Sequence, residues 1–338
     1  MVNGHGDDLY KYPHIKANFS SNVYSDTDNR ALLQHLEQCI PSVLGSYPEP
    51  EPYTLQAELA QHLGLSPDEV LVTNGATEAI YLIAQAFPST RTSFVEPTFR
   101  EYRDASLIMG HSVVDFDAHS IGALQVIWLC SPNNPTGQIV ETETNWIKEH
   151  PNTLFVVDRS YEYFSRKHLT DELCTRNAIY IHSLTKRYRI PGLRLGYITG
   201  HAETLKRIRN IRQPWSVNAL AVEAGLWIVR HGLPETIERS ELWAETDRLT
   251  RAIGAIEGYE VSRTDTHFML MRTPHRADLL KDWLARRHHL LVRDASNFYT
   301  LTTNHIRIAT QTPEANDCLI EALRSYPGDE EIEFSRLD

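Results

Sequence analysis

One lysine and one arginine in this chain have a spacing that suits a cofactor carrying an aldehyde and a phosphate. Ser183 and Thr185 lead into Lys186 at the end of an apolar run, and Arg194 follows Lys186 by eight residues. A lysine amine can form a Schiff base with an aldehyde. Hydroxyl groups and a guanidinium can hold a phosphate. Because one lysine near one arginine means little by itself, the rest of such a site must also be present.

A glycine turn offers a second place for a phosphate. Asn74-Gly75-Ala76-Thr77-Glu78 joins a predicted strand at 69–73 to a predicted helix at 77–87. Glycine permits a tight turn, and the first N–H groups of a helix have no partner within it. The backbone amides of Ala76 and Thr77, with the Thr77 hydroxyl, would cradle the phosphate. An ordinary helix N-cap also explains these residues and, taken alone, is the better interpretation.

These candidates depend on a series of strands that must bring them together. Apolar runs predict strands at 69–73, 93–96, 112–116, 125–130, 154–158, 178–182 and 195–199. Several are apolar throughout, as strands buried on both faces should be, and helical stretches separate them. This alternation predicts an α/β fold with a mostly parallel sheet. Ligands bind at the carboxyl ends of the strands in such sheets, where the candidate residues fall.

After about residue 202 the pattern changes to that of a smaller α+β domain. A helical region is predicted at 202–256, with a break near Gly232-Leu233-Pro234, and a helix at 278–287. Strands are predicted at 259–263, 267–272, 290–293 and 306–309. We therefore expect an N-terminal segment (1–45) on the small domain, a large cofactor-binding domain (46–225), a small C-terminal domain (226–330) and an acidic tail (331–338).

Two further strands end in polar motifs. The string Ser-Pro-Asn-Asn-Pro-Thr-Gly at 131–137 follows the strand that ends at Cys130, and Asp158 ends the strand at 154–158. Asn-Pro and Thr-Gly make a turn on any interpretation, but a turn does not require the whole string.

Together these motifs resemble those of the class I/II aminotransferases, which are pyridoxal-phosphate (PLP) enzymes of fold type I. Asn134, Asp158, Lys186 and Arg194 occur in the family order at family-like intervals, and four such matches in order are hard to attribute to chance. The similarity spans about 47–310. It implies PLP as cofactor and the fold of that family: a large, mostly parallel α/β/α sheet domain plus a smaller α+β domain.

The resemblance also implies a role for each residue of the cofactor site. Lys186 is the catalytic residue that carries the cofactor, Asp158 pairs with the ring nitrogen and Asn134 bonds the phenolic oxygen. A carboxylate keeps the pyridine nitrogen protonated, which makes the ring an electron sink. The other implied contacts are Gly75, Ala76, Thr77, Ser183, Thr185 and Arg194 at the phosphate, Tyr161 at the phenolic oxygen, Phe99 stacked on the ring and Tyr47 from a partner subunit.

Two of these assignments and one departure from the family pattern need comment. Tyr47 implies a homodimer with shared sites, in line with the usual twofold symmetry. A core position explains Phe99 almost equally well. The family usually has Asp-Glu-Ala-Tyr where this chain has Asp158-Arg159-Ser160-Tyr161. We expect Arg159 to be either a solvent-exposed substitution or a charge that contributes to substrate choice.

Segments outside the cofactor motifs bear on the substrate. His5-Gly6-Asp-Asp, Phe-Ser-Ser-Asn22 and Arg293-Asp-Ala-Ser-Asn-Phe resemble segments of threonine-phosphate decarboxylases, which are related to histidinol-phosphate aminotransferases. The resemblance implies His5, Gly6, Asn22 and Arg293 as substrate contacts, and Arg307 at the substrate carboxylate. The alternative is that His5 is one of sixteen histidines at a loose terminus, which residue type alone favours.

The leading hypothesis is decarboxylation of L-threonine O-3-phosphate to (R)-1-amino-2-propanol O-2-phosphate and CO2, a step of cobalamin biosynthesis. The alternative is a histidinol-phosphate or other amino-acid:2-oxoglutarate aminotransferase, in which Lys186 would move a proton between Cα and C4′. A PLP-binding transcription regulator is a third class. No basic helix-turn-helix pattern precedes Tyr47 to support it.

Composition restricts the partners and the location. The net charge of −11 argues against nonspecific binding to nucleic acid or to anionic membranes. The cysteines are widely spaced without a C-x-x-C pair, so neither a disulfide framework nor a metal site is indicated. No signal sequence and no apolar run of about 18 residues is present. We therefore expect a cytoplasmic enzyme with a small-molecule substrate.

Overall fold

The computed structural model describes residues 7–171 and 175–335. Its α-helices are α1 (Arg30–Val43), α2 (Tyr53–Leu63), α3 (Gly75–Ala86), α4 (Glu101–Ile108), α5 (Glu143–Glu149), α6 (Leu184–Arg187), α7 (Ala202–Arg209), α8 (Ala219–Arg230), α9 (Arg239–Gly254), α10 (Ala277–Trp283), α11 (Pro313–Arg324) and α12 (Asp329–Ser335). Its strands are β1 (Ala17–Asn18), β2 (Val70–Thr73), β3 (Arg91–Phe94), β4 (Ser112–Val113), β5 (Val126–Cys130), β6 (Leu154–Asp158), β7 (Ala178–Ser183), β8 (Gly196–Gly200), β9 (Glu260–Val261), β10 (Phe268–Arg272), β11 (Leu290–Leu291), β12 (Arg293–Asp294) and β13 (His305–Ala309).

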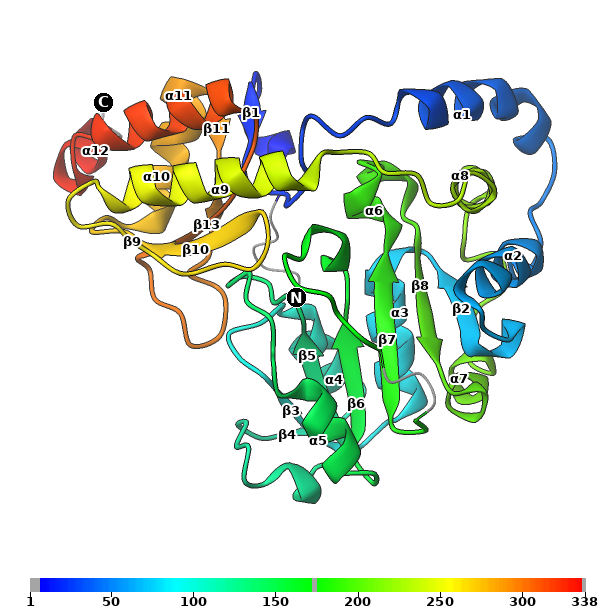
Figure 1. Ribbon diagram of the computed structural model, residues 1–338. Helices are drawn as coiled ribbons and strands as arrows, with labels where there is room; N and C mark the ends of the chain where they lie inside the picture. Colours follow the sequence, from blue (N-terminus) through cyan, green and yellow to red (C-terminus); the bar gives the residue numbers. More distant parts are fainter. Residues whose placement is uncertain (1–6, 172–174, 336–338) are drawn as a thin grey trace.

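The main sheet has the strand order β2-β8-β7-β6-β5-β3-β4 (Figure 1). Strand β8 runs antiparallel to both of its neighbours, whereas the β7-β6, β6-β5, β5-β3 and β3-β4 pairs are parallel. This confirms the predicted mostly parallel α/β domain. The carboxyl ends of β5, β6 and β7 consequently meet at one edge of the sheet.

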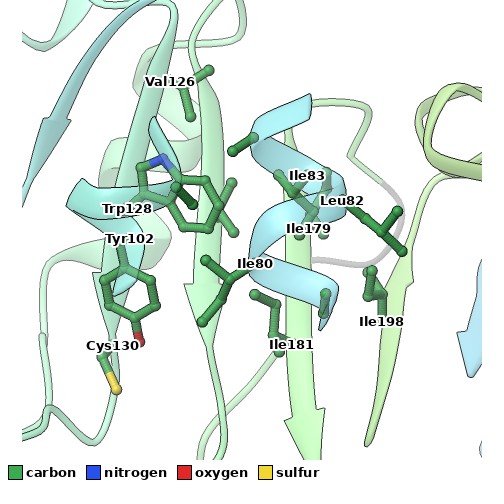
Figure 2. Packing of buried hydrophobic residues seen from close by; sticks show 14 of the residues in the cluster. Ile80, Leu82, Ile83, Tyr102, Val126, Trp128, Cys130, Ile179, Ile181 and Ile198 are labelled. Atoms are coloured by element: carbon green, nitrogen blue, oxygen red, sulfur yellow. The ribbon is translucent and has the colours of Figure 1, made fainter. Parts of the chain in front are cut away.

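Helices cover both faces of the main sheet because successive strand residues point to opposite sides. One face packs against α3, α4 and α7, with Ile80 and Ile83 of α3 lying over Ile179 and Ile181 of β7 (Figure 2). On the other face, α5 covers the centre of the sheet, and α1, α2 and α8 cover its β2 and β8 side. The residues at the strand tips are thus supported by a core on each side.

The smaller sheet has the order β12-β13-β10-β9 and is antiparallel throughout. Helices α9, α10 and α11 pack on it through a separate apolar cluster, which confirms the predicted α+β unit. The helical region predicted at 202–256 contains α7, α8 and α9, with an additional break at 210–218. Among the described helices, none combines the length and hydropathy that a membrane span requires.

The N-terminal segment contacts both parts of the molecule. Strand β1 pairs with β11, and the Phe19 carbonyl accepts from the Ala309 amide at 2.9 Å. Helix α1 instead packs on α8, with Leu32 and Leu36 in the apolar cluster on that side of the main sheet. The first part of the segment therefore lies on the small domain and α1 on the large one. The segment boundaries given above stay a prediction.

Candidate active site

Consecutive strand ends deliver the main polar groups to one cavity. Asp158 is the last residue of β6, Ser183 the last of β7, and Lys186 lies in α6 directly after β7. The cavity has a volume of about 210 Å³. It is lined by Asp7, Ser20, Ser21, Ala76, Thr77, Phe99, Tyr102, Cys130, Asn134, Asp158, Ser160, Tyr161, Ser183, Thr185, Lys186, Arg194 and Arg307. Most of the residues predicted for the cofactor site are thus brought together.

Lys186 is held with its amine inside the protein. Its Nζ donates to the Ser21 carbonyl at 2.8 Å. Burial lowers the pKa of Lys186 to about 8, and the nearby positive charges of Arg307 and Arg194 act in the same direction. The negative charge of Asp7 acts in the opposite direction. The uncharged amine, which is the form that attacks a carbonyl, is therefore more abundant near neutral pH than in a free lysine.

The phosphate end of the cavity depends on a residue without a side chain. Gly75 has a φ of +75°, and a Cβ there would lie 2.7 Å from Nη2 of Arg194. That backbone conformation favours glycine, and an added Cβ would displace the Arg194 guanidinium. Helix α3 begins at Gly75, so the free amides of its first turn lie beside the Arg194 guanidinium. These groups together form a preorganised anion site.

Asp158 also lines the cavity and is buried. One of its oxygens accepts from the Ser160 amide at 2.8 Å, and the other accepts from the Tyr102 hydroxyl at 2.7 Å. Burial raises the pKa of Asp158. The hydrogen bonds from Ser160 and Tyr102, and the charge of His182, oppose that rise.

Asn134, Tyr161 and Arg307 form the remaining wall. The Arg307 guanidinium donates to Oδ1 of Asn134 at 2.6 Å and to the Ser20 carbonyl. Its buried Nε has no hydrogen-bond partner among the described residues. Burial lowers the pKa of Arg307 to about 10, so it still carries its charge at neutral pH.

Some predicted site residues do not line this cavity. Tyr47 is 87% exposed and its ring lies 5.7 Å from that of Trp215. Asn22 is buried near Tyr161, and its side chain makes no hydrogen bond of standard geometry within the described residues. Arg293 is the cross-strand neighbour of Arg307 and donates to Asn297 at 2.7 Å. His5 and Gly6 lie outside the described residues.

The cavity also contains residues that the sequence did not single out as site residues. Asp7, Ser20 and Ser21 come from the N-terminal segment, and Tyr102 comes from α4. Tyr102 follows Phe99 by three residues, a separation of about one helical turn. That spacing is a signal from which Tyr102 could have been found, because Phe99 was already a candidate. For the N-terminal residues the only signal was their place inside segments considered for the substrate.

Arg159 is not the solvent-exposed residue that one interpretation predicted. Its side chain is 0% exposed. The guanidinium pairs with Glu143 and, at 2.9 Å, with Asp171, and it donates to the Ser131 carbonyl at 3.1 Å. It is not among the groups that line the cavity. Its charge is therefore neutralised in the protein, and it acts on the site by holding the loop that begins at Ser131.

A buried lysine, a buried carboxylate and an anion cradle around one cavity at the strand ends define a PLP-dependent enzyme. The sequence pattern of the family described as aminotransferase class I and II matches residues 14–323. The chain belongs to this family. Its cofactor is therefore PLP, as predicted, and its fold is fold type I.

Similar proteins include both histidinol-phosphate aminotransferases and a threonine-phosphate decarboxylase. A histidinol-phosphate aminotransferase of Thermoanaerobacter pseudethanolicus is 30% identical over 87% of this chain and 88% of its own. The crystal structure of L-threonine-O-3-phosphate decarboxylase from Porphyromonas gingivalis is 35% identical, with a TM-score of 0.87 over 91% of this chain and 98% of that one. The histidinol-phosphate aminotransferase structure from Clostridium acetobutylicum is 22% identical with a TM-score of 0.78, over 91% and 98% of the two chains.

The residues present fit PLP. At the anion cradle, a side chain on Gly75 would push away the Arg194 guanidinium that completes it. The Lys186 amine and the Asp158 carboxylate line the same cavity. This fits PLP, because its aldehyde, which the lysine would bind, and its pyridine nitrogen, which the carboxylate would hold, belong to one planar molecule. Phe99 contributes an apolar side chain to the lining of this cavity.

Proposed function

We propose that this enzyme decarboxylates a small phosphorylated amino acid, most specifically L-threonine O-3-phosphate. The observation that carries the proposal is the likeness to the Porphyromonas gingivalis decarboxylase, which is 35% identical with a TM-score of 0.87. The histidinol-phosphate aminotransferase structure of similar coverage is 22% identical, so its likeness supports the fold alone. A place in cobalamin biosynthesis and a cytoplasmic location belong to the same proposal.

The roles proposed for the cofactor residues are those that the family resemblance implies, and the chemistry of each side chain suits its role. Lys186 binds the aldehyde carbon, and Ala76, Thr77, Ser183, Thr185 and Arg194 bind the phosphate, with Gly75 leaving space for it. Asp158 holds the ring nitrogen, Asn134 and Tyr161 hold the phenolic oxygen, and Phe99 packs on the ring. PLP, when bound, withdraws electrons from the substrate Cα, which weakens the bonds around that atom.

Arg307 is proposed to bind the substrate carboxylate. A guanidinium forms two parallel hydrogen bonds with a carboxylate, and the unpartnered Nε of Arg307 offers one donor for this. Asn134 accepts from Arg307 through its oxygen, which leaves its amide N–H groups for the phenolic oxygen. By fixing the carboxylate, Arg307 selects which bond at Cα is aligned for cleavage.

The substrate phosphate is proposed to lie between the small sheet and the N-terminal segment. Arg293 is next to Arg307 across the β12-β13 pair, and both guanidinium groups are buried. Asn22 is buried without hydrogen bonds of standard geometry among the described residues, as expected of a group that a ligand satisfies. His5 and Gly6 complete this part of the proposal.

We further propose that the enzyme is a homodimer with shared sites. Tyr47 is absent from the lining of this chain's own cavity. It is exposed together with other large apolar side chains, namely Leu44, Tyr53 and Trp215. An exposed cluster of this kind marks a protein contact. In the proposed dimer it is covered, and Tyr47 reaches the cofactor phosphate of the partner subunit.

The second candidate is a histidinol-phosphate aminotransferase. It is favoured by the relative from Thermoanaerobacter pseudethanolicus, which is 30% identical over 87% of this chain. In that reaction Lys186 would carry a proton between two carbon atoms, for which its lowered pKa is suitable.

One experiment separates the two reactions. The purified enzyme with PLP is supplied with L-threonine O-3-phosphate and no keto acid, and CO2 release is measured. In parallel it is supplied with histidinol phosphate and 2-oxoglutarate, and glutamate is measured. The proposal predicts CO2 in the first assay and little glutamate in the second. Glutamate without CO2 would make the enzyme an aminotransferase.

A further inference from the structure

We infer that Tyr102 is a positioning residue that holds Asp158 in its ionised form toward the cofactor's ring nitrogen. The inference rests on the proposed contact between Asp158 and that nitrogen. Tyr102 lies in α4, which belongs to none of the sequence motifs of the site, and it acts through Asp158 rather than on the substrate.

The hydroxyl of Tyr102 lies beside the Asp158 carboxylate and the Cys130 thiol. It donates to Oδ2 of Asp158 at 2.7 Å, while the Ser160 amide donates to Oδ1 at 2.8 Å. Among the described residues, each carboxylate oxygen thus accepts at least one hydrogen bond, and a carboxylate oxygen has two lone pairs. A ring N–H can occupy one of the remaining positions. The carboxylate is therefore fixed in orientation before the cofactor arrives.

The aromatic ring of Tyr102 is held on both sides. It stacks on Trp128, with ring centres 5.5 Å apart and an angle of 16° between the planes (Figure 2). Phe99 meets it edge-on at 5.7 Å and itself lines the cavity. The Tyr102 amide also donates to the Phe99 carbonyl at 3.3 Å. One short stretch of chain thus carries both the apolar surface for the cofactor ring and the donor that orients Asp158.

The hydrogen bond from Tyr102 affects the proton that the Asp158 carboxylate and the pyridine nitrogen of the cofactor would share. Between a buried carboxylate and a pyridine nitrogen, the proton stays on nitrogen only if the carboxylate is sufficiently stabilised as an anion. Burial raises the pKa of Asp158, and Tyr102 opposes that rise. Burial and the Asp158 charge also raise the pKa of Tyr102 well above its usual value, so the phenol remains a donor. Losing this hydroxyl shifts the shared proton toward Asp158.

The test compares Tyr102→Phe with Tyr81→Phe. The Tyr81 hydroxyl likewise donates to a carboxylate, Glu101, at 2.8 Å, but it does not line the cavity. Apoenzyme is titrated with PLP labelled with ¹⁵N in the ring, and both the dissociation constant and the ¹⁵N chemical shift are measured. A hydrogen bond to a charged acceptor corresponds to about a 10- to 100-fold change in affinity.

We expect Tyr102→Phe to weaken PLP binding by about tenfold or more and to move the ¹⁵N shift toward that of unprotonated pyridine. Tyr81→Phe should leave both measurements close to wild type. An unchanged shift and affinity in Tyr102→Phe would overturn the inference. Absence of PLP binding in the wild type would instead overturn the cofactor contacts on which it rests.

A double-mutant cycle shows whether Tyr102 acts through Asp158. In an Asp158→Asn background, adding Tyr102→Phe should change PLP affinity by less than about twofold. A further tenfold loss there would mean that Tyr102 only supports the packing, and the inference would fail. If the Phe variant does not fold, 3,5-difluorotyrosine at position 102 keeps the ring and makes a stronger donor. It should keep the ring nitrogen protonated to higher pH, and no change in the ¹⁵N titration would count against the inference.

Discussion

The proposed cofactor side and the proposed substrate side of the cavity are built in different ways. On the cofactor side, Asp158 and Lys186 are placed by β6 and β7, which are hydrogen-bonded neighbours in the main sheet. On the substrate side, Asp7, Ser20 and Ser21 come from the N-terminal segment, and Arg307 comes from the small sheet. Few bonds join the two sides, among them those from Lys186 to the Ser21 carbonyl and from Arg307 to Asn134.

This difference separates two properties of the enzyme. Cofactor binding depends on strand ends that cannot shift without disturbing the central core. In the proposed function, substrate choice depends on the N-terminal segment and the small sheet, which belong to other parts of the chain. Substitutions on one side should therefore alter one property and largely spare the other, and the following predictions test that separation.

The largest effect is expected on the cofactor side. Lys186→Ala removes the amine that binds the aldehyde, so turnover should fall by at least about 10³-fold. The visible absorbance of the bound cofactor should change as well. Lys206→Ala, at an exposed position in α7, is the control. Normal turnover in Lys186→Ala would contradict the catalytic role of this lysine.

On the substrate side, Arg307→Lys should lower kcat/KM by about 100-fold, because lysine cannot form paired hydrogen bonds with a carboxylate. The dissociation constant for PLP should stay within about threefold of wild type. Arg272→Lys on neighbouring β10, where the arginine is exposed and pairs with Glu260, serves as the control. Equal losses in both measurements would show that the two sides are not separable.

The pH dependence of cofactor uptake gives the third test. Burial lowers the pKa of Lys186 to about 8. Below that pH the neutral amine becomes about tenfold rarer per pH unit, so the rate of PLP incorporation into apoenzyme should rise up to about pH 8 and then level off. Asp7 raises this pKa, so Asp7→Asn should move the midpoint to lower pH. A midpoint near that of free lysine would show that the amine is not desolvated.

The smallest effect is expected where the N-terminal segment is anchored. The buried Lys281 ammonium bonds both oxygens of Asp8, at 2.8 and 2.7 Å. Lys281→Met should loosen this segment and raise KM by about three- to tenfold, with PLP affinity unchanged. The double variant Lys281→Met with Asp8→Asn should recover part of the loss, because it leaves no unpaired buried charge. A fall in PLP affinity in Lys281→Met would show instead that the Lys281–Asp8 ion pair supports cofactor binding.

Local sequence was sufficient to predict that the proposed cofactor residues lie together. Asn134, Asp158 and Lys186 each follow an apolar run, and the ends of parallel strands necessarily meet at one edge. The mostly parallel sheet and the smaller α+β unit were predicted for the same reason. The strand that runs antiparallel, β8, was predicted as a strand, but nothing in its residues indicates its direction.

The substrate side depends on contacts between distant parts of the chain. Strand β1 has only two residues, Ala17 and Asn18, and its partner β11 lies at Leu290–Leu291. No periodicity can be detected in so short a strand. Arg159 illustrates the same limit, because a buried guanidinium requires partners, and Glu143 and Asp171 cannot be paired with it from sequence. Roles proposed for Asn22 and Arg293 therefore stay predictions.

The reversed strand β8 has a consequence for how the gene can change in length. Ser183 at the end of β7 pairs with Gly196 at the start of β8. The chain between them is therefore a loop that leaves one edge of the sheet and returns to the same edge. Lys186 and Arg194 stand near its two ends, and both line the cavity. Inserting or deleting a residue between them would displace the lysine or the arginine while the strands stayed in place. Length variation should therefore be tolerated poorly here and much better in connections at the opposite edge, such as the one between α5 and β6.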